Sequence, residues 1–347
     1  MENASTARAN LTPARIMEAG MAFWPAMTLL SAVKLGVFTE LGSGPKTGVE
    51  LQNVLGLHSR SNPDFFDTLL ALGFLEREGD REAAKYSNTP ETAAFLDRSS
   101  PTFMGGFLEM AHDRLYKFWG NLADGLKTGQ AQNEIKDGGP GMFEQLYSKP
   151  ERLEQFMDAM AGISAGNFQA FADKFDFSGY KTMTDVGGAT GLLSTFVAKS
   201  NPHMTCTTTD LPAATEIAAR KLEVAGVADR VAAEPIDFFK DPIKPADVVT
   251  MGMILHDWNL ENKMMLIRKA YDALPEGGAF VAIENIIDDA RRENAFGLMM
   301  SLNMLIEFGE AFDFTGADFD KWCREVGFTR TEVIHLAGPA SAAIAYK

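Results

Sequence analysis

In the second half of the 347-residue chain, short apolar runs alternate with stretches whose apolar residues recur at helical spacing. This alternation predicts an α/β fold with a doubly wound, mainly parallel sheet. Seven strands are expected at 182–186, 204–209, 230–234, 246–251, 279–284, 330–335 and 341–346. Helices are expected at 191–200, 213–225, 260–274, 294–307 and 316–326. Because the last two strands are too close for a crossover helix, they should form an antiparallel hairpin at the edge of the sheet.

The first hundred residues have a different pattern, with three short helices followed by a hairpin. Apolar spacing predicts helices over 28–41, from Thr47 onward, and over 61–72. Strands are expected around Phe74 and Tyr86, on either side of a polar turn. Three helices and a β-wing resemble a winged helix.

Charge argues against a nucleic-acid partner for this region. Asp64 and Asp67 lie in the third helix, where a helix that reads DNA would be basic. The whole chain has a net charge of −15 and a pI near 4.8, which repels phosphate backbones. Dimerisation through helix packing is therefore the better interpretation.

Composition also bears on the cellular compartment. The two cysteines, Cys206 and Cys323, provide neither a disulfide framework nor a metal cluster, which favours a reducing cytosol. The N-terminus does not resemble a secretory signal, and no apolar run approaches the roughly 20 residues of a membrane span. We expect a cytoplasmic protein with no metal and no membrane partner.

The stretch 184–212 contains the most informative motif. A buried strand at 182–186 leads into a turn with glycines at 187, 188 and 191, then a helix, then a strand that ends at Asp210. Such a unit lets backbone approach a ligand closely, and the acid can accept hydrogen bonds from ribose hydroxyls. A nucleoside is therefore the expected ligand, and a packing turn that binds nothing is the alternative.

The glycine spacing narrows the choice of nucleoside. A pyrophosphate-binding G-x-G-x-x-G would need glycines at 187, 189 and 192, but the chain has Ala189 and Leu192. A dinucleotide therefore fits in outline but not in detail, whereas a ligand without phosphate, such as S-adenosylmethionine (SAM), does not need the full motif.

Three residues are candidates for acid–base chemistry. His256 follows the strand at 246–251 and can accept a proton near neutral pH. Glu284 ends the neighbouring strand, and Asp313 lies in a later loop. Either carboxylate could fix the tautomer of the imidazole and stabilise its charged form. The alternatives are a core or capping histidine, a capping glutamate and a solvated loop aspartate.

Other side chains could contact a ligand. Asp237 lies beyond a strand end and could bind an adenine amine, with Phe238 against the ring; a turn cap and core packing are equally good interpretations. Residues 101–180 look helical and rich in Phe and Met, and Arg114 in this region could clamp a carboxylate or form a surface salt bridge.

The motifs DVGGATG, TTDLP, IDFF, ILHDW and ALPEGGAFVAIE occur in an order that resembles the SAM-dependent O-methyltransferases of the caffeate and acetylserotonin type, including bacterial members. The resemblance extends from about Ile16 to the end. It implies a winged-helix dimerisation domain at 1–100, a helical linker and substrate-pocket region at 101–178, and a class I methyltransferase domain at 179–347. It also implies a homodimer.

The resemblance assigns roles to individual residues. It implies that His256 is the general base, flanked by Glu284 and Asp313. The residues expected to hold SAM are Tyr147, Ser164, Gly187, Asp210, Leu211, Asp237 and Phe238. The residues expected on the acceptor side are Arg114, Tyr116, Met304 and Phe308.

Four positions depart from the family pattern. Asp313 replaces the usual glutamate, and Phe308 stands where plant members often have asparagine. Gly252 replaces a lysine of plant members, and Ala189 replaces the third glycine. The first two changes suggest an acceptor pocket that differs from the plant phenol site.

The expected function is methyl transfer from SAM to a small molecule, most simply to a hydroxyl oxygen. One alternative is S-methylation of a small thioether acid such as 4-methylthio-2-hydroxybutyrate, on the route to dimethylsulfoniopropionate, since a Met- and Phe-rich pocket suits a thioether. A SAM-binding regulator without transfer activity is the second alternative.

Overall fold

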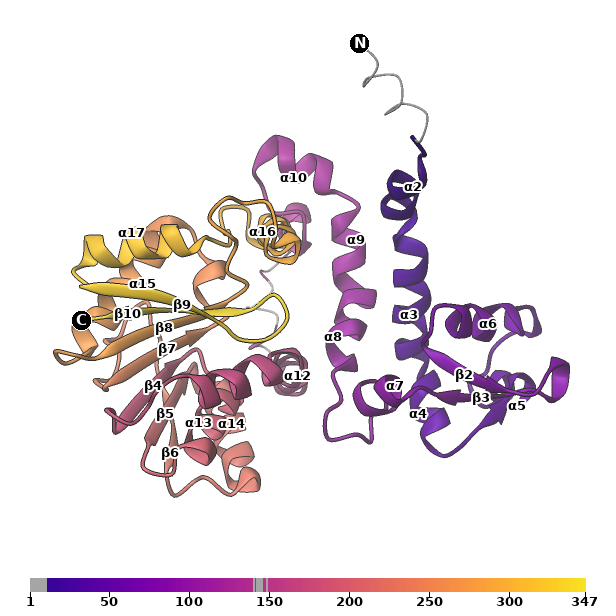
Figure 1. Ribbon diagram of the computed structural model, residues 1–347, viewed down its shortest axis with the longest axis horizontal. Helices are drawn as coiled ribbons and strands as arrows, with labels where there is room; N and C mark the ends of the chain where they lie inside the picture. Colours follow the sequence, from indigo (N-terminus) through magenta and orange to yellow (C-terminus); the bar gives the residue numbers. More distant parts are fainter. Residues whose placement is uncertain (1–10, 140, 142–145, 148) are drawn as a thin grey trace, which may run out of the picture. The chain divides into compact units, whose positions relative to one another are not determined.

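The computed structural model describes residues 11–139, 141, 146–147 and 149–347. The chain forms two compact units, Met1–Leu115 and Tyr116–Lys347 (Figure 1). The boundary between them falls inside the predicted linker and substrate-pocket region at 101–178.

The first unit is mainly helical, with a small three-stranded sheet. Its elements are α2 (Ala14–Met21), α3 (Phe23–Leu35), α4 (Val37–Gly42), β1 (Lys46–Thr47), α5 (Gly48–Val54), η1 (Ser59–Ser61), α6 (Asp64–Ala71), β2 (Leu75–Glu78), η2 (Arg81–Ala83), β3 (Lys85–Asn88), α7 (Pro90–Phe95), α8 (Gly105–Met110) and the π-helical η3 (Ala111–Leu115). The strands pair antiparallel in the order β1-β3-β2. This confirms the expected short helices and wing.

One predicted helix is wrong in its extent. The stretch 28–41 is divided between α3 and α4, because Gly36 adopts a left-handed conformation with φ 78° and ends α3. The second predicted helix starts where expected, since the Thr47 side chain accepts from the Glu50 amide in a capping box.

The acidic third helix, α6, is tied to the wing. The Asp67 carboxylate accepts from the Tyr86 hydroxyl at 2.7 Å and forms an ion pair with Arg77 at 2.7 Å. Phe66 and Leu69 of the same helix are fully buried in the core of this unit. The helix thus presents its apolar face inward and Asp67 to the wing, whereas Asp64 forms an ion pair with Arg60 just before the helix.

Among the described residues, one helical stretch, Ala14–Leu35, is long and apolar enough to cross a membrane by length and composition. The stretch is not an uninterrupted apolar run, because Glu18 and Lys34 lie within it, but its mean hydropathy is high enough to tolerate these charges. Core helices pass the same test, but within α2 and α3 only Leu30, Ala32 and Val33 are buried. Much of its apolar surface is therefore exposed within the chain.

The second unit is built on the seven-stranded sheet that the sequence predicts. Its strands are β4 (Thr182–Val186), β5 (Thr205–Asp210), β6 (Val231–Pro235), β7 (Val248–Gly252), β8 (Ala279–Glu284), β9 (Arg330–His335) and β10 (Ser341–Tyr346). They lie in the order β6-β5-β4-β7-β8-β10-β9, and only β10 pairs antiparallel with its neighbours. The order reverses between β4 and β7, which is where open α/β sheets bind ligands.

Helices cover both faces of this sheet (Figure 1). The described helices of this unit are α9 (Tyr116–Trp119), α10 (Leu122–Thr128), η4 (Glu134–Asp137), α12 (Pro150–Lys174), α13 (Leu192–Ser200), α14 (Pro212–Ala225), η5 (Leu255–Asp257), α15 (Leu260–Ala273), α16 (Ala295–Phe308) and α17 (Gly316–Val326). One core lies between the sheet and α15 with α17, and another between the sheet and α13 with the end of α12.

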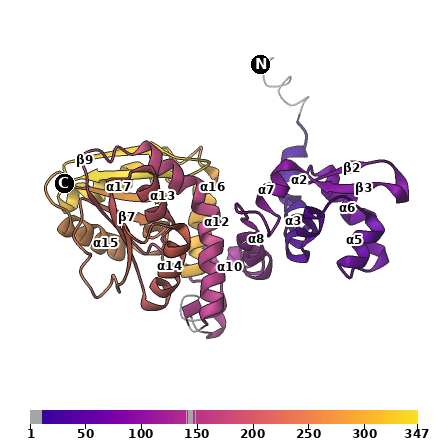
Figure 2. The same ribbon diagram turned by 90° about the horizontal axis from the view of Figure 1, so that it is seen from below.

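Strand β8 shows how the sequence builds two cores from one sheet. All six of its residues are buried. Phe280 packs on the side of α17, whereas Val281 packs on the opposite side, so alternate residues serve opposite faces. The long helix α12 packs against α13 and α14 (Figure 2). Because β7 and β8 pair in parallel, both strands end at the same edge of the sheet, where polar residues begin.

Candidate active site

The glycine turn after β4 brings backbone against the end of β5. The Gly187 and Gly188 amides donate to the Thr209 carbonyl at 2.8 and 3.0 Å. Gly187 has a φ of +69°, and a Cβ there would lie 2.4 Å from Ile254 Cδ1, so only glycine fits without a shift. Ala189 also has a positive φ, 46°, and its amide points to the end of β5. The backbone of the turn therefore packs directly against the end of β5.

Asp210, at the end of β5, accepts hydrogen bonds at both carboxylate oxygens. Oδ1 accepts from the Leu211 amide at 2.7 Å and from the Tyr147 hydroxyl at 2.9 Å, and Oδ2 accepts from the Ala189 amide at 3.0 Å. Burial raises the pKa of this carboxyl above its ordinary value, although the three hydrogen bonds act to lower it. Burial and the Asp210 charge raise the pKa of Tyr147, so its hydroxyl stays a neutral donor. The structure therefore brings together four of the residues predicted to hold SAM: Tyr147, Gly187, Asp210 and Leu211.

The other predicted cofactor residues are placed separately. Asp237 follows β6, and its carboxylate accepts from Lys240 at 2.6 Å, which lowers its pKa. Phe238 lies close to the glycine turn, since a Cβ on Gly187 would be 3.9 Å from its ring. Ser164 is buried in α12. Among the described residues, no hydrogen bond or ion pair joins Ser164 or Asp237 to the Asp210 carboxylate.

The turn that carries His256 is fixed by Glu284. After β7 the chain passes through Met253, which has a φ of 57°, and enters η5. Glu284 Oε1 then accepts three successive backbone amides, those of Ile254 at 3.2 Å, Leu255 at 3.0 Å and His256 at 3.4 Å. Because these groups are all buried or half-buried, one carboxylate oxygen satisfies donors that would otherwise lack partners. Glu284 therefore has a structural role as well as an electrostatic one.

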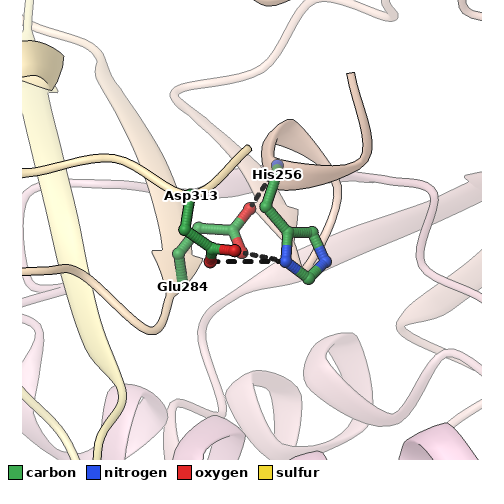
Figure 3. A group of neighbouring side chains, drawn as sticks. All are labelled: His256, Glu284 and Asp313. Carbon is green, nitrogen blue, oxygen red and sulfur yellow. Dashed lines mark hydrogen bonds and ion pairs between the residues drawn. The ribbon is translucent and has the colours of Figure 1, made fainter. Parts of the chain in front are cut away.

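Two carboxyl groups face Nδ1 of His256, while Nε2 points away from both of them (Figure 3). The distances from Nδ1 are 3.8 Å to Glu284 Oε2 and 3.5 Å to Asp313 Oδ1. Asp313 is held there because the neighbouring Phe314 carbonyl accepts from the Ile287 amide at 3.0 Å, just beyond β8. The shorter aspartate thus faces the imidazole as expected, but at a distance longer than an ordinary hydrogen bond.

Sequence reasoning missed Asp257. Its Oδ1 lies 3.3 Å from Nε2 of His256, on the side of the ring opposite Glu284 and Asp313. The sequence indicates only that Asp257 directly follows His256, and this does not show which way its side chain points. The imidazole therefore has a carboxylate near each ring nitrogen.

Burial and charge inside this cluster shift the pKa values of His256, Glu284 and Asp257. Burial alone would lower the pKa of His256, but the charges of Glu284, Asp257 and Asp313 outweigh it and raise the pKa to about 10. Burial raises the pKa of Glu284 to about 7 and that of Asp257 to about 6, against the pull of the imidazolium. At neutral pH the imidazole therefore holds its proton in the free chain.

The same three side chains have the donor set of a cation site. His256 Nδ1 and one oxygen each of Glu284 and Asp313 lie within 4.8 Å of one another, and all three residues are buried. A protonated imidazole provides positive charge to the same two carboxylates, so the geometry alone does not require a metal.

The predicted acceptor residues lie in both units. Met304 is buried in α16, which Phe308 ends, and Tyr116 begins α9 and is partly exposed. The α9 and α16 helices meet through a 2.8 Å bond from Trp119 Nε1 to the Asn303 side chain. Arg114 lies in the π-helical turn of the first unit.

The class I SAM-dependent methyltransferases have a seven-stranded sheet of this kind. A glycine turn follows the strand at which the strand order reverses, and an acid that can bind ribose ends the next strand, as Asp210 does here. Comparison with known structures agrees. Human N-acetylserotonin methyltransferase, solved in complex with SAM, matches with a TM-score of 0.90 and 26% identity over 97% of this chain and 98% of its own. The chain is therefore a SAM-dependent methyltransferase, with SAM as its cofactor.

Sequence comparisons define the family. A model of the O-methyltransferase domain matches residues 119–329. The tetracenomycin polyketide synthesis 8-O-methyl transferase of Streptomyces glaucescens is 35% identical over 96% of this chain and 97% of its own length. An N,N-dimethyltransferase of Streptomyces rimosus is 31% identical over 90% of each chain. The chain belongs to this O-methyltransferase family, whose relatives act on small molecules.

Proposed function

We propose that this protein transfers the methyl group of SAM to a hydroxyl oxygen of a small aromatic or polyketide-like acceptor, with His256 as general base. The observation that carries the proposal is the buried imidazole whose Nδ1 faces Glu284 and Asp313. The similarity to a polyketide 8-O-methyl transferase supports the class of acceptor.

Bound SAM supplies an electrophilic methyl group on a positively charged sulfonium. The chain's own residues then have distinct tasks. Asp210 would accept the ribose hydroxyls, a role that fits a half-buried carboxylate whose Oδ1 already accepts one hydroxyl, that of Tyr147. The glycine turn at Gly187 would lie against the ligand, and Asp237, Phe238, Leu211 and Ser164 complete the proposed cofactor site.

His256 would remove the acceptor proton through Nε2, the ring nitrogen that faces away from Glu284 and Asp313. Those two carboxylates then stabilise the imidazolium that forms. Because the pKa of His256 in the free chain is raised to about 10, close to the pKa of about 10 of a phenol, proton transfer between them is nearly balanced. Positive charge brought by the cofactor would lower the imidazole pKa and release the base for catalysis.

The segmentation into a dimerisation region at 1–100, a pocket region at 101–178 and a SAM domain at 179–347 remains part of this proposal, as does a cytoplasmic location. We assign Arg114, Tyr116, Met304 and Phe308 to the acceptor side. Of these, the apolar side chains of Met304 and Phe308 would contact the rings of an aromatic acceptor.

The first unit would form the homodimer. Helices α2 and α3 expose large apolar side chains, which a second copy could cover. The most exposed in these helices are Ile16, Met17, Phe23 and Trp24, and Leu11 just before α2 is exposed as well. Light scattering after size exclusion should give twice the chain mass for the natural protein and a lower mass for Trp24→Glu. A natural protein that is monomeric at micromolar concentration would contradict this assignment.

The acceptor is tested by a turnover screen. S-adenosylhomocysteine formation is measured with matched panels of phenols, hydroxylated polyketides, amines and small thioether acids. Turnover confined to hydroxyl acceptors supports the proposal. Turnover confined to amines or thioethers would overturn it in favour of N- or S-methylation.

A further inference from the structure

Lys269, in α15, donates from one ammonium group to three backbone carbonyls of the loop that follows β6. The distances from Nζ are 2.7 Å to the Phe238 oxygen, 3.2 Å to the Phe239 oxygen and 2.8 Å to the Asp241 oxygen. An ammonium has three N–H donors and no acceptor, so these carbonyls use all of its donors. Lys269 therefore holds the loop to α15 at three points.

The helix that carries this lysine is fixed in the core of its unit. Leu266, Ile267 and Ala270 are fully buried in the core between α15 and the sheet. The loop at 236–241, by contrast, belongs to no helix and only touches the end of β6. A packed helix thus restricts a segment whose backbone has no regular structure of its own.

The loop held by Lys269 forms a turn that orients the Asp237 side chain. The Asp237 carbonyl accepts from the amides of Lys240 at 2.8 Å and Asp241 at 2.7 Å, which closes the turn. Within the turn, Asp237 Oδ1 accepts from the Phe239 amide at 3.1 Å, and the Asp237 amide donates to Asp241 Oδ2 at 3.0 Å. Because Lys269 also holds the carbonyls of Phe239 and Asp241, it fixes the direction of this carboxylate.

The same lysine fixes the backbone of Phe238, whose carbonyl makes the shortest of the three bonds. The Phe238 ring packs edge-on against Trp258, with ring centroids 6.0 Å apart. It also lies beside the glycine turn, since a Cβ on Gly187 would be 3.9 Å from it. Lys269 therefore determines the position of both loop residues that are assigned to the cofactor site.

We propose that Lys269 is a positioning residue for the adenine end of SAM: through the loop carbonyls, its ammonium presents Asp237 to the adenine amine and Phe238 to the adenine ring. Because backbone occupies all three donors, the lysine acts through these residues and not by contact with the cofactor. The inference rests on the proposed place of Asp237 and Phe238 in the cofactor site. It is independent of the acceptor and of the role of His256.

The test compares two ligands by calorimetry in the absence of acceptor. One is S-adenosylhomocysteine, and the other is S-inosylhomocysteine, in which a carbonyl oxygen replaces the adenine amine. The natural protein should prefer the first, because a carboxylate accepts from an amine and repels a carbonyl oxygen. Lys269→Met should weaken binding of S-adenosylhomocysteine by about tenfold, the size of one hydrogen bond to a charged group. It should weaken binding of the inosyl ligand by no more than about threefold, because that ligand lacks this bond.

Lys174→Met is the matched control. Lys174 also donates to backbone carbonyls, those of His335 and Leu336, at 2.9 Å each. These residues lie at the end of β9, at the opposite edge of the sheet from β6. The control should therefore leave both affinities unchanged. An equal loss for the two ligands in folded Lys269→Met, or no loss, would overturn the proposal, as would the same change of preference in the control.

Should Lys269→Met fail to fold, Lys269→Gln provides the second variant. Its side-chain amide has two N–H donors on a shorter chain, so it cannot hold three carbonyls. The preference for S-adenosylhomocysteine should again fall, and a preference equal to that of the natural protein would contradict the proposal.

Two more variants separate this inference from the proposed cofactor site. Asp237→Ala and Phe238→Ala should each weaken S-adenosylhomocysteine binding while Lys269 is intact. Unchanged binding in both would remove these residues from the cofactor site and the inference with them. Weaker binding in both, together with an unchanged preference in Lys269→Met, would leave the cofactor site in place and overturn the role of Lys269 alone.

Discussion

Glu284 combines a structural and an electrostatic task, and two substitutions separate them. Glu284→Ala leaves three buried or half-buried backbone amides, those of residues 254–256, without their acceptor. An unsatisfied buried donor costs about 1–3 kcal/mol, and three donors that share one oxygen together should cost about 3–5 kcal/mol. Glu284→Gln keeps a carbonyl oxygen for these amides and removes a buried charge, so it should cost about 1 kcal/mol or less.

The same pair of variants reports on the charge. Ionised Glu284 is the strongest contributor that raises the pKa of His256, so its removal should lower the His256 midpoint by about one unit or more in Glu284→Gln. The rising limb of the rate profile should move to lower pH. Turnover at its plateau should fall about 10-fold or more, because the imidazolium formed in the transition state loses a partner.

The assays are urea unfolding of the free protein at pH 7.5 for both variants, and NMR titration plus kcat/KM against pH for Glu284→Gln. Equal destabilisation by Ala and Gln would refute the amide-capping role. A His256 midpoint that is the same in Glu284→Gln as in the natural chain would refute the electrostatic role.

Three further outcomes are expected. Asp210→Asn should weaken SAM binding at least tenfold by calorimetry, since bonds to a charged acceptor contribute about 1.5–3 kcal/mol each; unchanged affinity would remove Asp210 from the cofactor site. Burial raises the pKa of Asp185 to about 7, above its value in the unfolded chain. Ionisation of Asp185 therefore lowers the free energy of unfolding. This loss of stability is absent below about pH 4 and complete above about pH 7. Asp185→Asn should therefore raise the free energy of unfolding at pH 8 by up to about 4 kcal/mol but not at pH 4, and Thr250 can still donate to its side chain. Prolonged dialysis against a chelator should leave turnover unchanged; loss that Zn²⁺ or Mn²⁺ restores would instead make the His256 cluster a metal site.

The sheet could be predicted from sequence because its signals are local. Each strand is a short apolar run between helical stretches, and the final hairpin follows from a connection too short for a helix. The division of 28–41 depended on a single backbone angle at Gly36, and a glycine inside an apolar pattern does not show whether its φ is positive.

Within the site, residues at strand ends were predictable and residues placed by loops were not. His256 and Glu284 end or follow adjacent parallel strands, so their proximity follows from topology. The contact of Asp257 with Nε2 depends on how η5 packs, which no periodicity records. The resemblance to a family placed Asp313, although its distance from the ring required the structure.

The central claim is that His256 is the base for methyl transfer to a hydroxyl. It is tested most directly by comparing His256→Gln with the natural chain for SAM affinity by calorimetry and for turnover of the hydroxyl acceptor identified in the screen. We expect an affinity within about threefold and a loss of turnover of at least about 100-fold, the usual range for removal of a general base. Turnover within tenfold of the natural chain, with SAM affinity intact, would contradict it.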